Sequence, residues 1–310
     1  MPCLCNQALK AIRLLRPKAD DAFIKHILDR VMDFLRQDDL LSFPAPKGGQ
    51  VIYRILSEEL GEPDPYSHLR RITNAKALEY EKYIQDIIAK SKDPLNTALK
   101  VAIIGNIIDF AAHTSIEIDT ELQNVAAIPI AIDDSGPFFE DLKVAERILY
   151  IGDNSGEIVF DKLFIEEILR QFPSKKIIFS VRGGPIINDA LLSDAREIGL
   201  DSIVTVIQSS QSPGVILDES PPKFREEFEH ADLICVKGQG NFEALSEPNL
   251  PTKAHVYFLL KVKCSLMEQL FKRPVGSLVI KKFQWDSISP IFGTKHIYFY
   301  SFKAQQREKW

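Results

Sequence analysis

The chain has 310 residues, of which 43 are acidic and 38 are basic, giving a formal net charge of −5. A chain of this length can bury a substantial core, and its acidic balance provides no broad basic surface, so we expect no nucleic-acid partner. No apolar run approaches the roughly 18 residues that span a bilayer, and the first residues lack the pattern of a signal peptide, so we expect no membrane partner and a cytoplasmic location.

Residues 1–95 have a helical pattern. Apolar residues recur at three- and four-residue spacing in residues 22–35 and 51–60, which is typical of amphipathic helices. Two segments rich in proline and glycine, residues 43–49 and 61–65, separate these helices. The pattern therefore predicts an all-helical subdomain over residues 1–95.

Strand-like and helical runs alternate over residues 96–280. This alternation predicts βαβ units, and hence an α/β fold with a mostly parallel, Rossmann-like sheet flanked by helices. The expected strands are residues 125–132, 147–151, 176–181, 203–207, 233–236 and 255–260. Residues 281–310 form an extension that holds both tryptophans and an aromatic, basic sequence. We expect them to add an edge strand and a helix to the body; an oligomer contact and a non-native extension are the alternatives.

Polar residues follow three of these strands at the point where each strand ends. They are Asp153 and Asn154 after the second strand, Arg182, Asn188 and Asp189 after the third, and Lys237 and Asn241 after the fifth. The carboxyl ends of parallel strands meet at one edge of a sheet, where open α/β sheets bind their ligands. One such group alone would be interpreted as a polar turn that caps a helix. Three groups at one edge indicate a binding site.

Three further polar residues are candidates for the same site. Asn106 and Asp109 lie at positions i and i+3 of an apolar helical segment, so both project from one face of that helix. Glu157 lies in the first helical turn after Asp153, where a favourable interaction with the helix dipole is the alternative interpretation.

Ordered motifs in this chain resemble those of the damage-control phosphatases, a family of metal-dependent enzymes formerly classed as a domain of unknown function. The resemblance extends from the first residues to about residue 280. Within the family, the chain is most similar to the prokaryotic branch. The matching motifs are DPYSHLRRITNAKAL from Asp64, GNIIDF from Gly105, GDNSGE from Gly152, PIINDA from Pro185, KGQGNFEAL from Lys237 and LLKVKC from Leu259.

The resemblance implies a divalent metal ion held by Asp153, Asn154 and Asp189. Oxygen ligands suit magnesium, manganese or a similarly octahedral ion such as cobalt or nickel. Asp153, Asp189 and Lys237 are then the expected catalytic residues, with Lys237 as a point charge against substrate phosphate. The expected substrate-binding residues are Asn106, Asp109, Glu157, Arg182, Asn188 and Asn241.

The substrate implied by the resemblance is a small phosphorylated metabolite, either a sugar phosphate or a damaged phosphometabolite. Two mechanisms stay open at this point: attack on phosphorus by Asp153, and attack by a metal-bound water. The interpretation of Lys237 as a solvated strand-end lysine also stays open.

Two other functions fit the strand-turn-helix at Gly152. One is an S-adenosylmethionine-dependent carboxyl methyltransferase, and the other is a non-catalytic protein that binds a metal and a phosphometabolite. The glycine spacing is not GxGxxG, and the carboxylate of Asp153 would repel a pyrophosphate, so a dinucleotide is disfavoured. The sequence leaves the oligomeric state undetermined.

Overall fold

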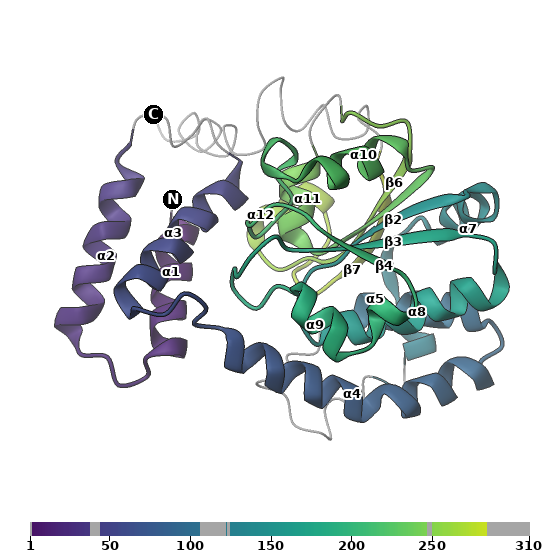
Figure 1. Cartoon of the computed structure of the whole chain (residues 1–310), viewed down its shortest axis with the longest axis horizontal. Helices are drawn as coiled ribbons and strands as arrows, with labels where there is room; N and C mark the ends of the chain where they lie inside the picture. Colours follow the sequence, from purple (N-terminus) through teal and green to yellow (C-terminus); the bar gives the residue numbers. More distant parts are fainter. Residues whose placement is uncertain (1, 38–43, 106–121, 123–124, 247–249, 284–310) are drawn as a thin grey trace.

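The computed structural model describes residues 2–37, 44–105, 122, 125–246 and 250–283. Three helices, α1 to α3, lie beside a seven-stranded sheet that has helices on both faces, and the long helix α4 runs from the first group along the sheet (Figure 1). Among the described residues, no helix has both the length and the apolar character needed to cross a membrane.

The helices before the sheet follow from local signals in the sequence. They are α1 (Pro2–Leu15), α2 (Asp21–Leu35), α3 (Ala45–Leu60), α4 (Ser67–Lys90) and α5 (Pro94–Ile104). The Asp20 side chain caps α2 by accepting a hydrogen bond from the backbone N–H of Phe23, and Asp93 caps α5 in the same way. Apolar side chains at helical spacing, such as Ile27 and Ile52, form the core that joins α1, α2 and α3.

The sheet has the strand order β1-β7-β6-β5-β2-β3-β4. Its strands are β1 (Ile130–Asp133), β2 (Arg147–Ile151), β3 (Lys176–Val181), β4 (Thr205–Gln208), β5 (Leu233–Lys237), β6 (His255–Lys261) and β7 (Leu278–Lys282). All neighbouring strands are parallel except β6 and β7, which confirms the mostly parallel α/β fold. The expected strand over residues 125–132 is wrong at its start, because Val125–Ala127 form a 3₁₀ helix and Pro129 precedes the first strand residue.

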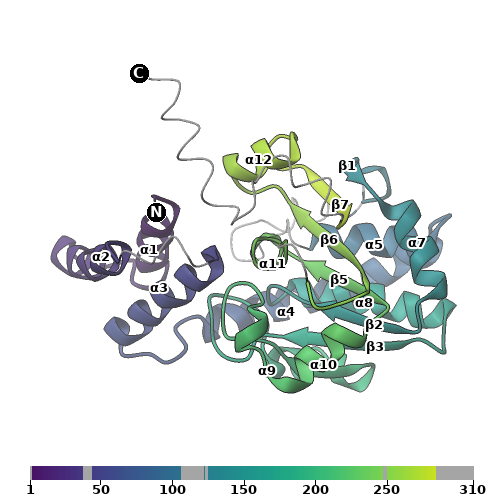
Figure 2. The ribbon, with the colours of Figure 1, turned by 90° about the horizontal axis from the view of Figure 1, so that it is seen from above.

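Alternate side chains of the strands point to the two faces of the sheet, and each face packs on its own helices. Tyr150 and Phe179 belong to the core on the side of α4, α5 and α8 (Glu157–Gln171), whereas Leu149 and Ile178 belong to the opposite core. The opposite core includes residues of α10 (Pro222–His230), α11 (Gln239–Leu245) and α12 (Ser265–Phe271). Two further α-helices in the described part of the chain are α7 (Ser135–Val144) and α9 (Leu192–Glu197). The result is a three-layer molecule with α1, α2 and α3 at one end of the sheet (Figure 2).

The strand order reverses between β2 and β5. From β2 the chain continues to β3 and β4 on one side, and then crosses back to add β5 and β6 on the other. The segments that leave the carboxyl ends of β2 and β5 therefore diverge, and ligands of open α/β sheets bind at such a reversal. Asp153 and Gly238 follow these two strands directly.

β7 ends at Lys282, so it includes the first two residues of the extension expected over residues 281–310. It pairs with β1 on one side and β6 on the other, so at least its first residues belong to the sheet. The other expected features of residues 284–310, including both tryptophans, lie outside the described residues.

Candidate active site

Two backbone hydrogen bonds join the segment after β2 to the segment after β3. The N–H of Ala190 donates to the carbonyl of Asp153 at 2.9 Å, and the N–H of Ser155 donates to the carbonyl of Asn188 at 2.9 Å. Asn154 and Asp189 are paired as an isolated antiparallel bridge. The backbone thus brings together Asp153, Asn154 and Asp189, the three residues expected to bind metal.

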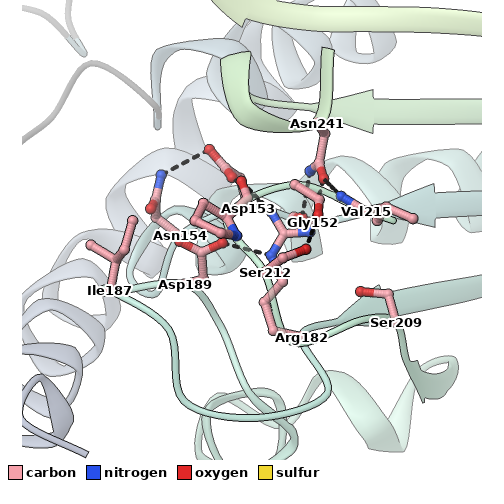
Figure 3. Close-up of polar contacts among 12 residues, drawn as sticks. Gly152, Asp153, Asn154, Arg182, Ile187, Asp189, Ser209, Ser212, Val215 and Asn241 are labelled. Atoms are coloured by element: carbon pink, nitrogen blue, oxygen red, sulfur yellow. Dashed lines mark hydrogen bonds and ion pairs between the residues drawn. The ribbon is translucent and has the colours of Figure 1, made fainter. Parts of the chain in front are cut away.

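The guanidinium of Arg182 lies among these carboxylates and is 1% exposed. Its Nε donates to Oδ2 of Asp189 at 2.6 Å, its Nη2 donates to Oδ1 of Asp153 at 3.3 Å, and its Nη1 donates to Oδ1 of Asn241 at 2.8 Å. Figure 3 shows the arginine side chain reaching these three groups from the end of β3. This geometry favours a role in holding the two carboxylates in place.

Asn241 is fully buried behind Arg182. Its Oδ1 also accepts from the N–H of Val215 at 3.0 Å, and its Nδ2 donates to the carbonyls of Gly152 at 3.2 Å and Lys237 at 2.8 Å. These four hydrogen bonds use all the capacity of a side-chain amide. The geometry therefore assigns Asn241 a bracing position and leaves its side chain no hydrogen-bonding group for substrate.

Lys237 is also fully buried, and it points away from the solvent. Its Nζ donates to Oε1 of Glu157 at 2.6 Å, to Oδ1 of Asp161 at 2.5 Å and to the carbonyl of Ala102 at 2.8 Å. These contacts use the three protons of the ammonium group. The geometry gives no support to the expected contact of Lys237 with phosphate, nor to the alternative of a solvated lysine.

Asp161 is a buried residue of this network that none of the sequence motifs indicated. Its Oδ1 accepts a hydrogen bond from the hydroxyl of Tyr150 at 2.6 Å as well as from Lys237. The only local signal for it is its position four residues after Glu157, which puts both carboxylates on the same face of α8.

The remaining candidates are placed less directly. Asn154 donates from Nδ2 to Oδ2 of Asp153 at 2.9 Å and to Oε2 of Glu157 at 3.3 Å, so Glu157 connects the Asp153 group to Lys237. Asn188 contributes the carbonyl that Ser155 binds. Asn106 and Asp109 lie outside the described residues.

The charges of this connected network do not balance. Four buried carboxylates, those of Asp153, Glu157, Asp161 and Asp189, accompany two buried cations, Arg182 and Lys237. With all four carboxyl groups ionised, two negative charges are left in excess within this set, and buried excess charge is costly. One divalent cation would neutralise the set, and the donors that converge here are carboxylate and amide oxygens, the ligand types that hard cations prefer. The residues present therefore fit a divalent metal ion.

The pKa values of the carboxylates reflect the same imbalance. Burial raises the pKa of Asp153 to about 7; repulsion from Asp189 and Glu157 adds to the effect, and the positive charges of Lys263 and Arg182 oppose it. Burial likewise raises the pKa of Asp189 above its ordinary value, against the opposing effect of Arg182. Each carboxylate is thus easier to protonate than in water, which is the expected behaviour of buried groups of like charge.

Gly238 shapes the site from the end of β5. Its φ is +81°, and a Cβ atom there would lie 2.0 Å from Oδ2 of Asp153. Only glycine provides both the backbone conformation and the space that the Asp153 carboxylate occupies.

A cavity of about 540 Å³ lies next to the segment that leads to Asp189. Its walls come from α3, from residues 63–66, and from the segment 185–187, with Gln211 and Glu219. Ile187 in its wall has φ +43°, an unusual conformation for a β-branched residue. The phenol of Tyr53, another wall residue, is mostly buried; burial raises its pKa, and the charge of Asp189 contributes to the shift. Ile187 thus connects the cavity wall to Asp189, two residues further along the chain, although Asp153, Asn154 and Asp189 are not themselves wall residues.

Known proteins resemble the chain over most of its length. A family model described as the damage-control phosphatase ARMT1-like domain matches residues 1–279. A damage-control phosphatase of Pyrococcus horikoshii is 40% identical over 282 residues, which cover 90% of this chain and 95% of that protein. A damage-control phosphatase of Archaeoglobus fulgidus is 34% identical over 236 residues, covering 74% of this chain and 80% of that protein.

A solved structure agrees with the sequence relatives. The crystal structure of a DUF89 family protein from Pyrococcus horikoshii has a TM-score of 0.81 and 34% sequence identity, and the match covers 91% of this chain and 97% of that one. The motifs, the family model and the fold thus agree, and they favour a phosphatase over a methyltransferase. The chain belongs to the damage-control phosphatase family.

Proposed function

We propose that this phosphatase depends on a divalent metal ion and hydrolyses small phosphorylated metabolites. The proposal rests mainly on the excess of two negative charges among the buried groups around Asp153 and Asp189. Asp153, Asn154 and Asp189 would hold the ion, which would be magnesium, manganese, cobalt or nickel. When bound, such an ion polarises a phosphoryl oxygen and offsets the charge that develops on the leaving oxygen.

The residues of the chain have separate tasks in this proposal. Arg182 orients the carboxylates of Asp153 and Asp189 through its Nη2 and Nε, and Asn241 holds Arg182 in that position. Glu157 links Asn154 to the buried Lys237. Catalysis of phosphoryl transfer depends mainly on positioning and on electrostatic stabilisation, and this network supplies a fixed frame for both.

The cavity whose wall includes Ile187 would accept the organic part of the substrate, to which the phosphate is attached. Its polar lining includes the neutral side chains of Gln50, Tyr53 and Gln211. Its charged wall groups have partners of opposite charge: Lys47 lies 3.0 Å from Glu219, Arg54 lies 4.0 Å from Glu58, and Asp64 is paired with Arg70. A neutral, hydroxylated molecule such as a sugar suits this lining better than a second phosphate does.

Phosphate release tests the proposal directly. Metal-depleted protein would be supplied in turn with magnesium, manganese, cobalt or nickel, with an aryl phosphate and with sugar monophosphates as substrates. We expect activity only after metal is restored, and a loss of at least 100-fold in the variants Asp153→Asn and Asp189→Asn. Asp141→Asn is the control, because Asp141 is also a paired aspartate, bound to Tyr257 and Lys282 at the opposite edge of the sheet. Activity that does not depend on added metal and that is unchanged in both site variants would contradict the proposal.

A further inference from the structure

One turn of α4 buries three polar side chains, Arg70, Thr73 and Asn74, which are 3%, 5% and 0% exposed. Their spacing of three and four residues puts them on one face of the helix. Buried faces of helices are normally apolar, so this face requires specific partners. Besides Asp64 and carbonyls of α4 itself, the partners lie in the two segments that contain the proposed metal ligands and in α9.

Thr73 and Asn74 contact the segment after Asn154. The hydroxyls of Thr73 and Ser155 share a hydrogen bond of 2.9 Å, and the N–H of Gly156 donates to Oδ1 of Asn74 at 2.7 Å. The Nδ2 of Asn74 donates to Asp194 at 2.9 Å and to Glu197 at 2.8 Å, so its amide is fixed from both sides.

Arg70 reaches the second segment. Its Nη1 lies 3.4 Å from the carbonyl of Ile187, and its Nε lies 3.4 Å from Oδ2 of Asp194. Asp64, which precedes α4, accepts two hydrogen bonds from the same guanidinium. Ile187 is the residue with the unusual positive φ, two positions before Asp189. The arginine thus contacts the chain at a residue whose backbone conformation is unusual for a β-branched side chain.

We infer that Arg70, Thr73 and Asn74 are positioning residues for the metal site, which hold the segments of Asn154 and Asp189 against each other although they supply no ligand. The inference rests on the proposed function. Partners of this kind that orient metal ligands contribute to metal affinity, because a site that is already ordered loses less entropy when it binds. Part of the metal affinity would then come from the N-terminal helical region.

Thr73 offers a matched pair of variants. Thr73→Val keeps the shape of the side chain and removes the hydroxyl that bonds Ser155, whereas Thr73→Ser keeps the hydroxyl. Asn74→Ala removes the acceptor for Gly156 as well as both amide contacts. Glu81→Gln is the control on the same helix, because Glu81 accepts its hydrogen bond, at 2.5 Å, from Lys162 of α8.

The measurement is the dissociation constant of Mn²⁺ for metal-depleted protein, from the electron paramagnetic resonance signal of free Mn²⁺, with the melting temperature of the metal-free protein recorded in parallel. We expect Asn74→Ala to weaken Mn²⁺ binding by about 10-fold or more, as removal of such partners does at other metal sites. Thr73→Val should weaken it by a smaller factor, and Thr73→Ser should restore it. Glu81→Gln should lower the melting temperature without changing the affinity.

Each result has a definite meaning. Wild-type affinity in Thr73→Val and Asn74→Ala would overturn the inference while the proposed function stands. A wild-type protein that binds no Mn²⁺ would overturn the proposed function, and the inference with it. If Asn74→Ala does not fold, the difference between Thr73→Val and Thr73→Ser decides the question.

Discussion

The carboxylate of Asp153 occupies the space that a Cβ atom at position 238 would need. In Gly238→Ala, the added Cβ would meet Oδ2 of Asp153, and the φ of +81° would be unfavourable for alanine. We expect the carboxylate to be displaced, so that Mn²⁺ affinity falls by at least about 10-fold. We also expect the strained backbone to cost about 1–3 kcal/mol of stability.

Gly276→Ala separates these two effects. Gly276 has φ +99°, and a Cβ atom there would have no neighbour within 4 Å. Both variants should therefore lose stability in chemical unfolding, whereas only Gly238→Ala should lose metal affinity. Equal metal affinity in the two variants would show that Asp153 tolerates the added methyl group.

At the scale of elements, Lys237 joins β5 to α8 through two buried ion pairs. Its ammonium contacts Glu157 and Asp161, one turn apart on that helix, so Lys237→Met would leave two buried carboxylates without their cation. Removing one partner of a buried ion pair typically costs about 3–5 kcal/mol. Burial already raises the pKa of Asp161 to about 6, in opposition to Lys237. Without Lys237 the pKa of Asp161 should be higher still, so the deficit should already shrink as the pH falls from 8 towards 5, because protonation removes the excess charge.

Urea unfolding at pH 5 and pH 8 would measure this deficit. Lys25→Met is the control, since Lys25 contacts Asp29 at 2.6 Å and both side chains are exposed. Such pairs contribute about 0–1 kcal/mol. A Lys237→Met variant with wild-type stability and a raised KM would instead support the phosphate contact expected from the sequence.

Elements with strong local patterns were predictable, and elements that depend on distant partners were not. β2 and β3 match the expected ranges at both ends, because each is a mostly apolar run that begins at a basic residue and ends before a glycine or an arginine. The start of β1 was misplaced because Pro129, which lacks an N–H group, separates the apolar residues before it from the strand. β7 was not among the expected strands, since it is a short run that is stabilised by pairing with β1 and β6.

The same distinction applies to the site. The approach of Asp153, Asn154 and Asp189 follows from the rule that parallel strands end at one edge, and the structure places them together. The direction of the Lys237 side chain depends on the packing of α8 against β5, and the role of Asn74 depends on the packing of α4. Neither packing has a local signal in the sequence beyond the spacing of Glu157 and Asp161.

At the scale of the whole molecule, the excess negative charge couples folding to pH and to metal. The pKa of Asp153 is about 7 in the folded, metal-free protein and near 4 in an unfolded chain. Between these values the folded state binds more protons than the unfolded state. The contribution of Asp153 to stability is therefore fully present below about pH 4 and is lost as the pH rises through about 7.

Metal binding should have the opposite pH dependence, because the ion competes with the proton for the carboxylate. We expect the metal-free protein to lose stability between pH 6 and pH 8. The stabilisation on adding Mn²⁺ should grow over the same interval, towards the roughly 2.7 kcal/mol that a ligand provides at 100 times its dissociation constant. Urea unfolding with chelator and with Mn²⁺ at the two pH values measures both quantities.

The variant Asp153→Asn isolates the contribution of this carboxylate from that of every other titrating group. Its amide does not titrate, so the metal-free variant should show a smaller loss of stability between pH 6 and pH 8 than the wild-type chain, and Mn²⁺ should stabilise it little at either pH. A variant with the same pH profile as the wild-type chain would mean that Asp153 is not the group that links folding to pH. The excess charge would then be relieved by protonation elsewhere in the network, with Asp161, whose pKa is about 6, as the next carboxylate to test.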